Sequence, residues 1–253
     1  MKTWINIFIA EGIKQKRSLT VLVILLAPGL MVIFNLLLGL SGYYGRQESG
    51  AEIMKTILNN SLNLWALIML PMSMALLTAL NANVEYRNNQ WKYLYTLPVS
   101  PWKVMMAKWV TNVAMAAFSH LLYFGLIIAT GLYLCTVNGQ SFAGSLDYLY
   151  LFQHLGIIFL ASILLITIHT IAALTLENFL TAMAFGTMMM ISNYFVAQSE
   201  KYGIFSPWAY PMRLNHFMTS DVYFWPILGL NLLGSVIVAA VAMKALTMRQ
   251  VLT

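Results

Sequence analysis

Charged residues are scarce in this sequence of 253 residues: Asp, Glu, Lys and Arg together make up 9% of it. Because a water-soluble domain carries about 25%, this composition excludes an ordinary soluble enzyme or binding module. A single cysteine, Cys135, excludes a disulfide within the chain. The apolar residues form continuous runs instead of alternating with polar ones over about ten residues, which argues against the strands of an outer-membrane barrel.

Motifs for nucleotide binding are also absent. The sequence contains neither G-x-x-x-x-G-K-[ST] nor a dinucleotide-binding fingerprint. We therefore expect no cofactor in this chain, and any ATP and Mg²⁺ would be bound by a separate subunit. No internal repeat and no Gly/Ser-rich linker divide the sequence, so we predict one membrane domain over residues 1–253.

What the sequence does contain is six long apolar runs. A run of about 20 apolar residues is long enough for a helix to cross the hydrocarbon core of a bilayer, about 30 Å. The sequence therefore predicts an all-α membrane protein. The expected spans are residues 19–40, 61–83, 104–134, 149–175, 179–197 and 224–246.

Basic residues indicate how these spans are oriented, since loops rich in Lys and Arg stay in the cytoplasm. With the N-terminus inside, the inner segments hold ten basic residues: Lys2, Lys14, Lys16, Arg17, Arg87, Lys92, Lys103, Lys108, Lys244 and Arg249. The outer segments hold four: Arg46, Lys55, Lys201 and Arg213. We expect both termini in the cytoplasm.

Residues 1–17 have a helical apolar pattern and a basic character. Trp4, Ile5, Phe8, Ile9 and Ile13 share one side of such a helix, although Ile7 breaks the pattern. A basic helix with an apolar face lies in the headgroup layer of a membrane. We predict an interfacial helix here; a simple cytosolic tail is the alternative.

The densest polar and aromatic segment, "EYRNNQWKYLYTLPVSPWKVMMAK", lies between the second and third runs. Its first half fits a short helix that Pro98 ends, because proline removes a backbone donor. Ser100 and Pro101 then suit the start of the next helix, Ser100 as a cap. Two interpretations stay open from composition alone. The segment is either an aromatic belt at headgroup level or a docking element for a cytosolic partner.

This same segment resembles the loop between the second and third spans of ABC-2 type transporter permeases, in particular those of peptide-antibiotic (lantibiotic or bacitracin) immunity and resistance exporters. The outer segment "SPWAYPMRL" and the six-span layout are similar too. The resemblance implies that residues 85–103 form a coupling-helix loop that docks on an ABC ATPase subunit. The implied docking residues are Glu85, Trp91, Lys92, Tyr93, Leu94, Tyr95 and Pro98.

Two further sets of residues are candidates. The resemblance implies that the outer segment 198–224 is re-entrant, with Trp208 and Tyr210 at an outer gate; an ordinary loop with aromatic anchors is the alternative. His120 and His169 lie within predicted spans. Ionisable residues there are functional candidates, and neutral histidines bonded to neighbouring helices are the alternative. The four histidines show no metal-site spacing.

We therefore expect a permease subunit, not itself an enzyme, of an ATP-driven exporter in the bacterial cytoplasmic membrane. The implied partners are two copies of an ABC ATPase, a second permease (identical or different) and membrane lipid, with no nucleic acid. The expected substrate is amphipathic: an antimicrobial peptide, a lipid or a drug-like molecule. Alternatives are a polytopic membrane enzyme, an assembly factor or an ATP-independent secondary transporter. The scarcity of acids inside the runs counts against the secondary transporter.

Overall fold

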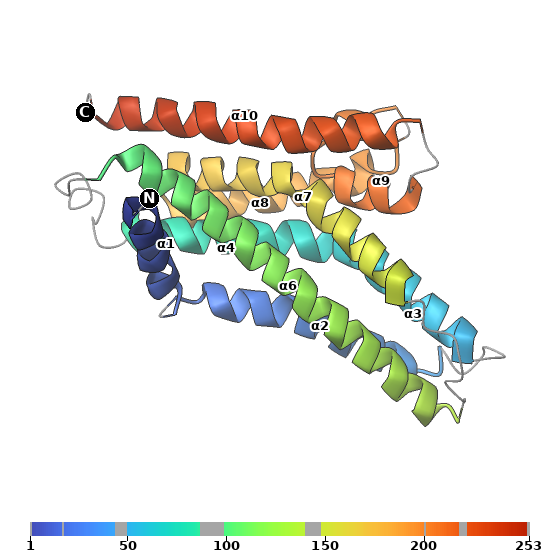
Figure 1. Ribbon diagram of the computed structural model, residues 1–253. Helices are drawn as coiled ribbons and strands as arrows, with labels where there is room; N and C mark the ends of the chain where they lie inside the picture. Colours follow the sequence, from blue (N-terminus) through green and yellow to red (C-terminus); the bar gives the residue numbers. More distant parts are fainter. Residues whose placement is uncertain are drawn as a thin grey trace.

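The structure, a computed structural model, describes residues 2–16, 18–43, 50–86, 99–139, 148–199, 201–217 and 222–251. All regular structure in these ranges is helical, which confirms the predicted all-α class (Figure 1). The helices are α1 (Lys2–Gln15), α2 (Thr20–Leu40), α3 (Gly50–Leu64), η2 (Trp65–Met69), α4 (Leu70–Tyr86), α6 (Pro101–Val137), α7 (Tyr148–Leu176), α8 (Phe179–Val196), η3 (Gly203–Phe205), α9 (Tyr210–Phe217) and α10 (Phe224–Val251).

Six of the described helical segments are long and apolar enough to cross a membrane, as the sequence predicts. They are Thr20–Leu40, Gly50–Tyr86, Pro101–Val137, Tyr148–Leu176, Phe179–Val196 and Phe224–Thr247. The second segment begins eleven residues before the predicted residue 61, so the prediction of a loop there is wrong. Helix α3 is amphipathic and buries Ile53 and Ile57 inside the bundle. Polar residues on its other face interrupt the apolar run in the sequence, so the run was not recognised as a helix.

A wide turn interrupts the second spanning segment between α3 and α4. Residues 65–69 form a π-helix, and the backbone N–H of Leu70 donates to the carbonyl of Trp65, five residues back. Pro71 follows directly and cannot donate a backbone hydrogen bond of its own. Such single π-turns inside an α-helix often occur at functional sites.

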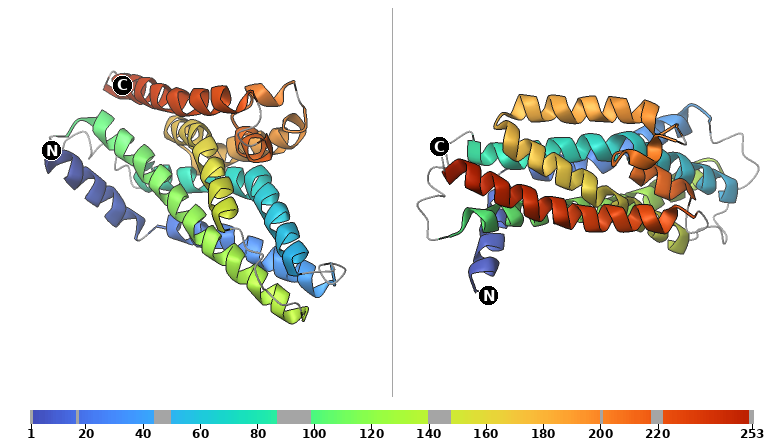
Figure 2. Two further views of the ribbon diagram at one scale, coloured as in Figure 1. Left: turned by 45° about the vertical axis from the view of Figure 1, so that its right-hand side comes forward. Right: turned by 90° about the horizontal axis from the view of Figure 1, so that it is seen from above.

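The bundle has two distinct ends (Figures 1 and 2). The N-terminus, the end of α4, the beginning of α6 and the C-terminal part of α10 lie together at one end, which we call the proximal end. The beginning of α3, the end of α6 and α9 lie at the other, the distal end. Helix α1 crosses the proximal end at a steep angle to α2 and α10.

Of the six spanning segments, the α3–α4 segment and α7 are the most buried, and they contact most of the other described helices. Large apolar side chains of α2, α8 and α10 point outward instead, among them Leu22, Met188 and Leu233. An apolar surface of this kind suits hydrocarbon surroundings. Helices α4 and α8 approach very closely at Gly186, where an added Cβ would overlap the Cβ of Ala75.

Candidate functional site

Most of the predicted docking residues fall outside the described part of the chain: Trp91, Lys92, Tyr93, Leu94, Tyr95 and Pro98. Glu85 is the exception and lies in the last turns of α4, with none of its side chain exposed. Helix α4 ends at Tyr86 and α6 begins at Pro101. The structure therefore shows the helix ends on both sides of the predicted coupling loop, the end of α4 and the start of α6, and we call these two helix ends the frame of the loop.

Four charged side chains form a closed ring in this frame. Lys14 Nζ lies 2.7 Å from Glu11 Oε1 and 2.6 Å from Glu85 Oε1. Lys108 Nζ lies 3.0 Å from Glu11 Oε2 and 3.0 Å from Glu85 Oε1. Each carboxylate therefore contacts both ammonium groups, and the ring joins α1, α4 and α6.

Because these charged side chains are buried, each one needs its partners in the ring. The side chains of Glu11 and Lys108 are each 1% exposed, and that of Lys14 is 26% exposed. A buried charge without a partner is strongly unfavourable, so two acids and two bases that neutralise each other are stable here only as a set. Partial burial alone would lower the pKa of Lys14, but the carboxylates of Glu11 and Glu85 outweigh it and raise that pKa above its ordinary value of 10.5.

The side of α1 that faces the bundle is its polar one. Ile7, Glu11 and Gln15, four residues apart, are buried, whereas Ile9 and Ile13 are exposed. Of the predicted apolar face, Ile5, Ile9 and Ile13 point away from the protein, whereas Trp4 and Phe8 are partly buried against it. Ile7 breaks the sequence pattern because it belongs to the buried stripe.

A chain of side-chain hydrogen bonds continues from the ring into the bundle. Gln15 Nε2 donates to Asn81 Oδ1 (2.8 Å), and Asn81 Nδ2 donates to Asn112 Oδ1 (2.7 Å). Asn112 Nδ2 then donates to Thr170 Oγ1 (3.0 Å). These buried contacts link α1, α4, α6 and α7, so displacement of one helix at the proximal end changes the hydrogen bonds of the others.

The start of α6 is also fixed to α1. The ring of Trp102 meets that of Trp4 edge to face, with centroids 5.9 Å apart, and Lys103 Nζ lies 5.8 Å from the Trp4 centroid. Pro101 occupies the first helical position as predicted, and Ser100 is the N-cap residue. The predicted side-chain cap is wrong: the Ser100 hydroxyl makes no capping bond, and its backbone carbonyl accepts from the N–H of Lys103 instead.

The two intramembrane histidines are each bonded to a tryptophan of another segment. Trp65 Nε1, at the start of the π-helix, donates to His120 Nε2 (3.2 Å), and His120 Nδ1 contacts the Ala116 carbonyl (2.8 Å). Trp208 Nε1 donates to His169 Nε2 (3.0 Å). Both histidines are buried. This geometry matches neutral imidazoles, and whether either one acts in gating stays a prediction.

The outer segment folds back onto the bundle. Helix α9 packs against α7, and Tyr210 at its start is buried. The indole of Trp208 reaches His169 on α7, so this candidate gate residue faces the interior of the bundle. Asn215 of α9 also contacts α7: its Oδ1 lies 2.6 Å from His154 Nδ1. Both predicted outer residues therefore pack near α7, Trp208 through His169 and Tyr210 in a cluster with Leu164.

The ring partners of Glu85 were missed from the sequence as site residues. Lys108 lies within the predicted third span, and Glu11 is the sole acid before residue 48. A charge within an apolar run needs a partner, and this was the available clue. Within the described ranges, no group of three or more His, Cys, Asp or Glu side chains could hold a metal ion.

Comparisons with known proteins give one match. The family model described as ABC-2 family transporter protein matches residues 7–194, a stretch that includes the ring, both sides of the predicted coupling loop, four whole spanning segments and nearly all of the fifth. No curated protein and no solved structure matches the chain. Because the match covers more than half of the sequence and the described helices provide six membrane-spanning segments, the chain belongs to the ABC-2 transporter family as a multi-pass membrane permease.

Proposed function

We propose that this permease is the membrane subunit of an exporter in the bacterial cytoplasmic membrane, and that it moves an amphipathic substrate. Membership of the ABC-2 family implies an ABC ATPase partner in general. The observation that carries the proposal is the buried ring of Glu11, Lys14, Glu85 and Lys108 between α1, α4 and α6. It ties together the helices on both sides of the segment expected to meet the ATPase.

The ring supports a mechanical role for that segment. A force on residues 87–98 would act on the end of α4 and on the start of α6. Because Glu85 and Glu11 both bind Lys108, these two helices and α1 would respond together. Helix α6 has 37 residues and is therefore about 55 Å long at about 1.5 Å per residue. It would carry a displacement from the proximal to the distal end.

The proximal end is then the cytoplasmic one. The excess of Lys and Arg in the inner segments supports this orientation, with both termini inside. In the proposed cycle, ATP binding draws two ATPase subunits together and moves the coupling segments of two permeases, identical or different. The outer segment near Trp208 and Tyr210 would open, and substrate would leave. Residues Trp91 to Tyr95 would make the ATPase contact, with ATP and Mg²⁺ on the partner.

The substrate class follows from the resemblance to peptide-antibiotic immunity and resistance exporters and from the apolar composition. We propose an antimicrobial peptide, a lipid or a drug-like amphipathic molecule. Within the described residues, the spanning helices carry no acidic cluster that would select a strongly cationic solute.

The deciding experiment is a pull-down of the tagged protein from its native host in mild detergent, with mass spectrometry of retained proteins. The test variant is Leu94→Asp, which adds a charge to the expected contact face. The matched control is Ala245→Asp, which adds the same charge to an exposed position near the proximal end of α10. Wild type and the control should retain an ATPase with a phosphate-binding loop, and Leu94→Asp should lose it.

An absence of any ATPase from the wild-type sample, with the protein folded, would overturn the exporter proposal. The membrane-enzyme and secondary-transporter alternatives would then take its place. Retention of the ATPase by Leu94→Asp would leave the exporter function standing and would reject residues 91–95 as the contact.

A further inference from the structure

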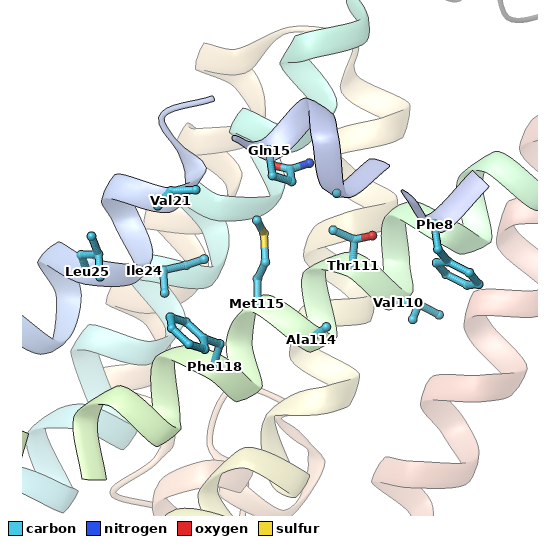
Figure 3. Close-up of a pocket in the computed structure, with 11 residues that line it drawn as sticks. Phe8, Gln15, Val21, Ile24, Leu25, Val110, Thr111, Ala114, Met115 and Phe118 are labelled. Carbon is cyan, nitrogen blue, oxygen red and sulfur yellow. The ribbon is translucent and has the colours of Figure 1, made fainter. Parts of the chain in front are cut away.

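An apolar groove lies beside the charged ring, between α1, the first turns of α2 and the middle of α6 (Figure 3). It holds about 460 Å³, within the about 300–1,000 Å³ typical of small-molecule sites. Phe8 and Gly12 border it from α1, Ile24 from α2, and Val110 and Met115 from α6. We propose that this groove binds an acyl chain of an anionic glycerophospholipid.

The lining selects an apolar occupant. Gln15 and Thr111 are the two polar residues among those that line the groove. The amide of Gln15 is already engaged, because its Nε2 donates to Asn81 and its Oε1 accepts from Thr20 at 2.6 Å. A ligand that needs several hydrogen bonds would lose them here, whereas a hydrocarbon chain loses none.

The surroundings indicate that this occupant comes from the bilayer. Large apolar side chains at the groove, Leu25 of α2 and Phe118 of α6, are about half exposed. The groove is therefore continuous with the outward-facing apolar surface of two membrane-spanning helices. Its other border is α1 at the proximal end, next to which lipid headgroups would lie. A chain entering along α2 and α6 would reach α1 with its headgroup nearby.

The charge of this border selects the headgroup. The first 18 residues hold four basic residues, Lys2, Lys14, Lys16 and Arg17, and one acid, Glu11. Glu11 is buried in the ring and neutralised there, whereas Lys16 is exposed. Because the ring is neutral as a set, the exposed Lys16, next to the groove residue Gln15, makes the accessible charge here positive. A basic helix at a membrane surface attracts anionic lipids, so a phosphatidylglycerol-type lipid fits better than a zwitterionic one.

Occupancy would have a consequence for the ring. Helix α1 contacts the rest of the protein through Glu11, Lys14 and Gln15 on one side, and Phe8 and Gly12 border the groove. An acyl chain would fill the space between α1, α2 and α6 and would hold α1 in the position that completes the ring. The bound lipid is thus a structural ligand of the proximal end, whatever substrate is transported.

Gly12 provides a direct test. An added Cβ at Gly12 meets no atom within 4 Å, and the residue borders the groove, so we expect the side chain of Gly12→Leu to extend into the space of the lipid. Gly29→Leu is the matched control: it is also helical, also meets nothing within 4 Å and does not line the groove. Both changes replace a helical glycine by a good helix former.

The measurement is photolabelling of the purified protein in detergent with phosphatidylglycerol that carries a diazirine in its acyl chain, followed by peptide mass spectrometry. In wild type and Gly29→Leu, labels should concentrate in residues 21–25 and 110–118. In Gly12→Leu, labelling there should fall by about tenfold, which corresponds to about 1.4 kcal/mol of binding. A phosphatidylcholine probe with the same chain should label wild type less.

Three results would overturn the proposal. Equal labelling of wild type and Gly12→Leu would show that the groove is not the site. Equal labelling by the two lipids would reject the anionic headgroup. Labels spread evenly over all outward-facing helices would show bulk lipid without a bound chain.

Discussion

The ammonium of Lys108 lies 3.0 Å from the carboxylate of Glu85, and both side chains are almost completely buried. One residue belongs to the last turns of α4, and the other is two turns into α6. Their contact closes the base of the segment between those helices. Lys14 and Glu11 of α1 complete the pairing, so a helix at the N-terminus decides whether the two spans stay joined.

Removing the charge of Lys108 should destabilise the protein strongly. Lys108→Met leaves Glu11 and Glu85 with Lys14 alone, and breaking a buried pair costs about 3–5 kcal/mol. Lys244→Met, on an exposed position of α10, should change stability by less than about 0.5 kcal/mol. Thermal unfolding in detergent measures both.

A second variant separates the charge from the packing of Lys108. Lys108→Met combined with Glu85→Gln restores the balance of one acid and one base in the ring. The double variant should therefore be more stable than Lys108→Met alone, a coupling that a double-mutant cycle measures. Additive losses, or a Lys108→Met variant as stable as Lys244→Met, would contradict the ring.

Lys14 should make this stabilisation sensitive to high pH. The pKa of Lys14 is raised in the folded protein, so its contribution is fully present below its ordinary value of 10.5 and is lost as the pH rises through the folded pKa. The difference in unfolding temperature between wild type and Lys14→Met should stay constant from neutral pH to about 10 and shrink above it. Lys14→Arg should keep the stability to higher pH because arginine stays charged. A difference that shrinks between neutral pH and 9 would reject this role of Lys14.

The six spans could be predicted because a bilayer demands long apolar runs whatever packs against them. The start of α3 could not, because its Glu52, Lys55 and Asn59 resemble a loop until the opposite face is seen to be buried. The ring was equally hidden. Lys14 and Glu85 are 71 residues apart, and Lys108 and Glu11 are 97 apart. No local pattern specifies such pairs, although the isolated charge of Lys108 within an apolar run indicated that a partner was required.

The contact between α7 and the outer segment should depend on the pair of Trp208 and His169. Trp208→Phe removes the donor and leaves the buried Nε2 of His169 unpaired, which costs about 1–3 kcal/mol. Replacing both residues by Phe should recover much of the loss, because no buried polar atom is then left without a partner. Trp225→Phe, on an exposed position of α10, is the control. The measurement compares the unfolding temperatures of wild type, Trp208→Phe, the double variant and Trp225→Phe. A Trp208→Phe variant no less stable than Trp225→Phe would mean that this hydrogen bond does not stabilise the contact of the outer segment with α7.

The ring and the ATPase contact should fail in different ways. Glu85→Gln weakens the pairing of α4 with α6 and lowers stability but leaves residues 91–95 unchanged, so the fraction that stays folded in the membrane should still retain the ATPase in the pull-down. Transport should fall by a factor within the range of about 5–150 that is typical of coupling between two sites. Transport can be measured as protection of host cells against bacitracin or a lantibiotic. The agent used is one against which the wild-type protein protects. Glu177→Gln makes the same chemical change at an exposed residue between α7 and α8 and should transport normally.

If Glu85→Gln lost the ATPase as Leu94→Asp is expected to, the ring would shape the docking surface itself. If Glu85→Gln transported like Glu177→Gln, the four charges would stabilise the fold without transmitting movement.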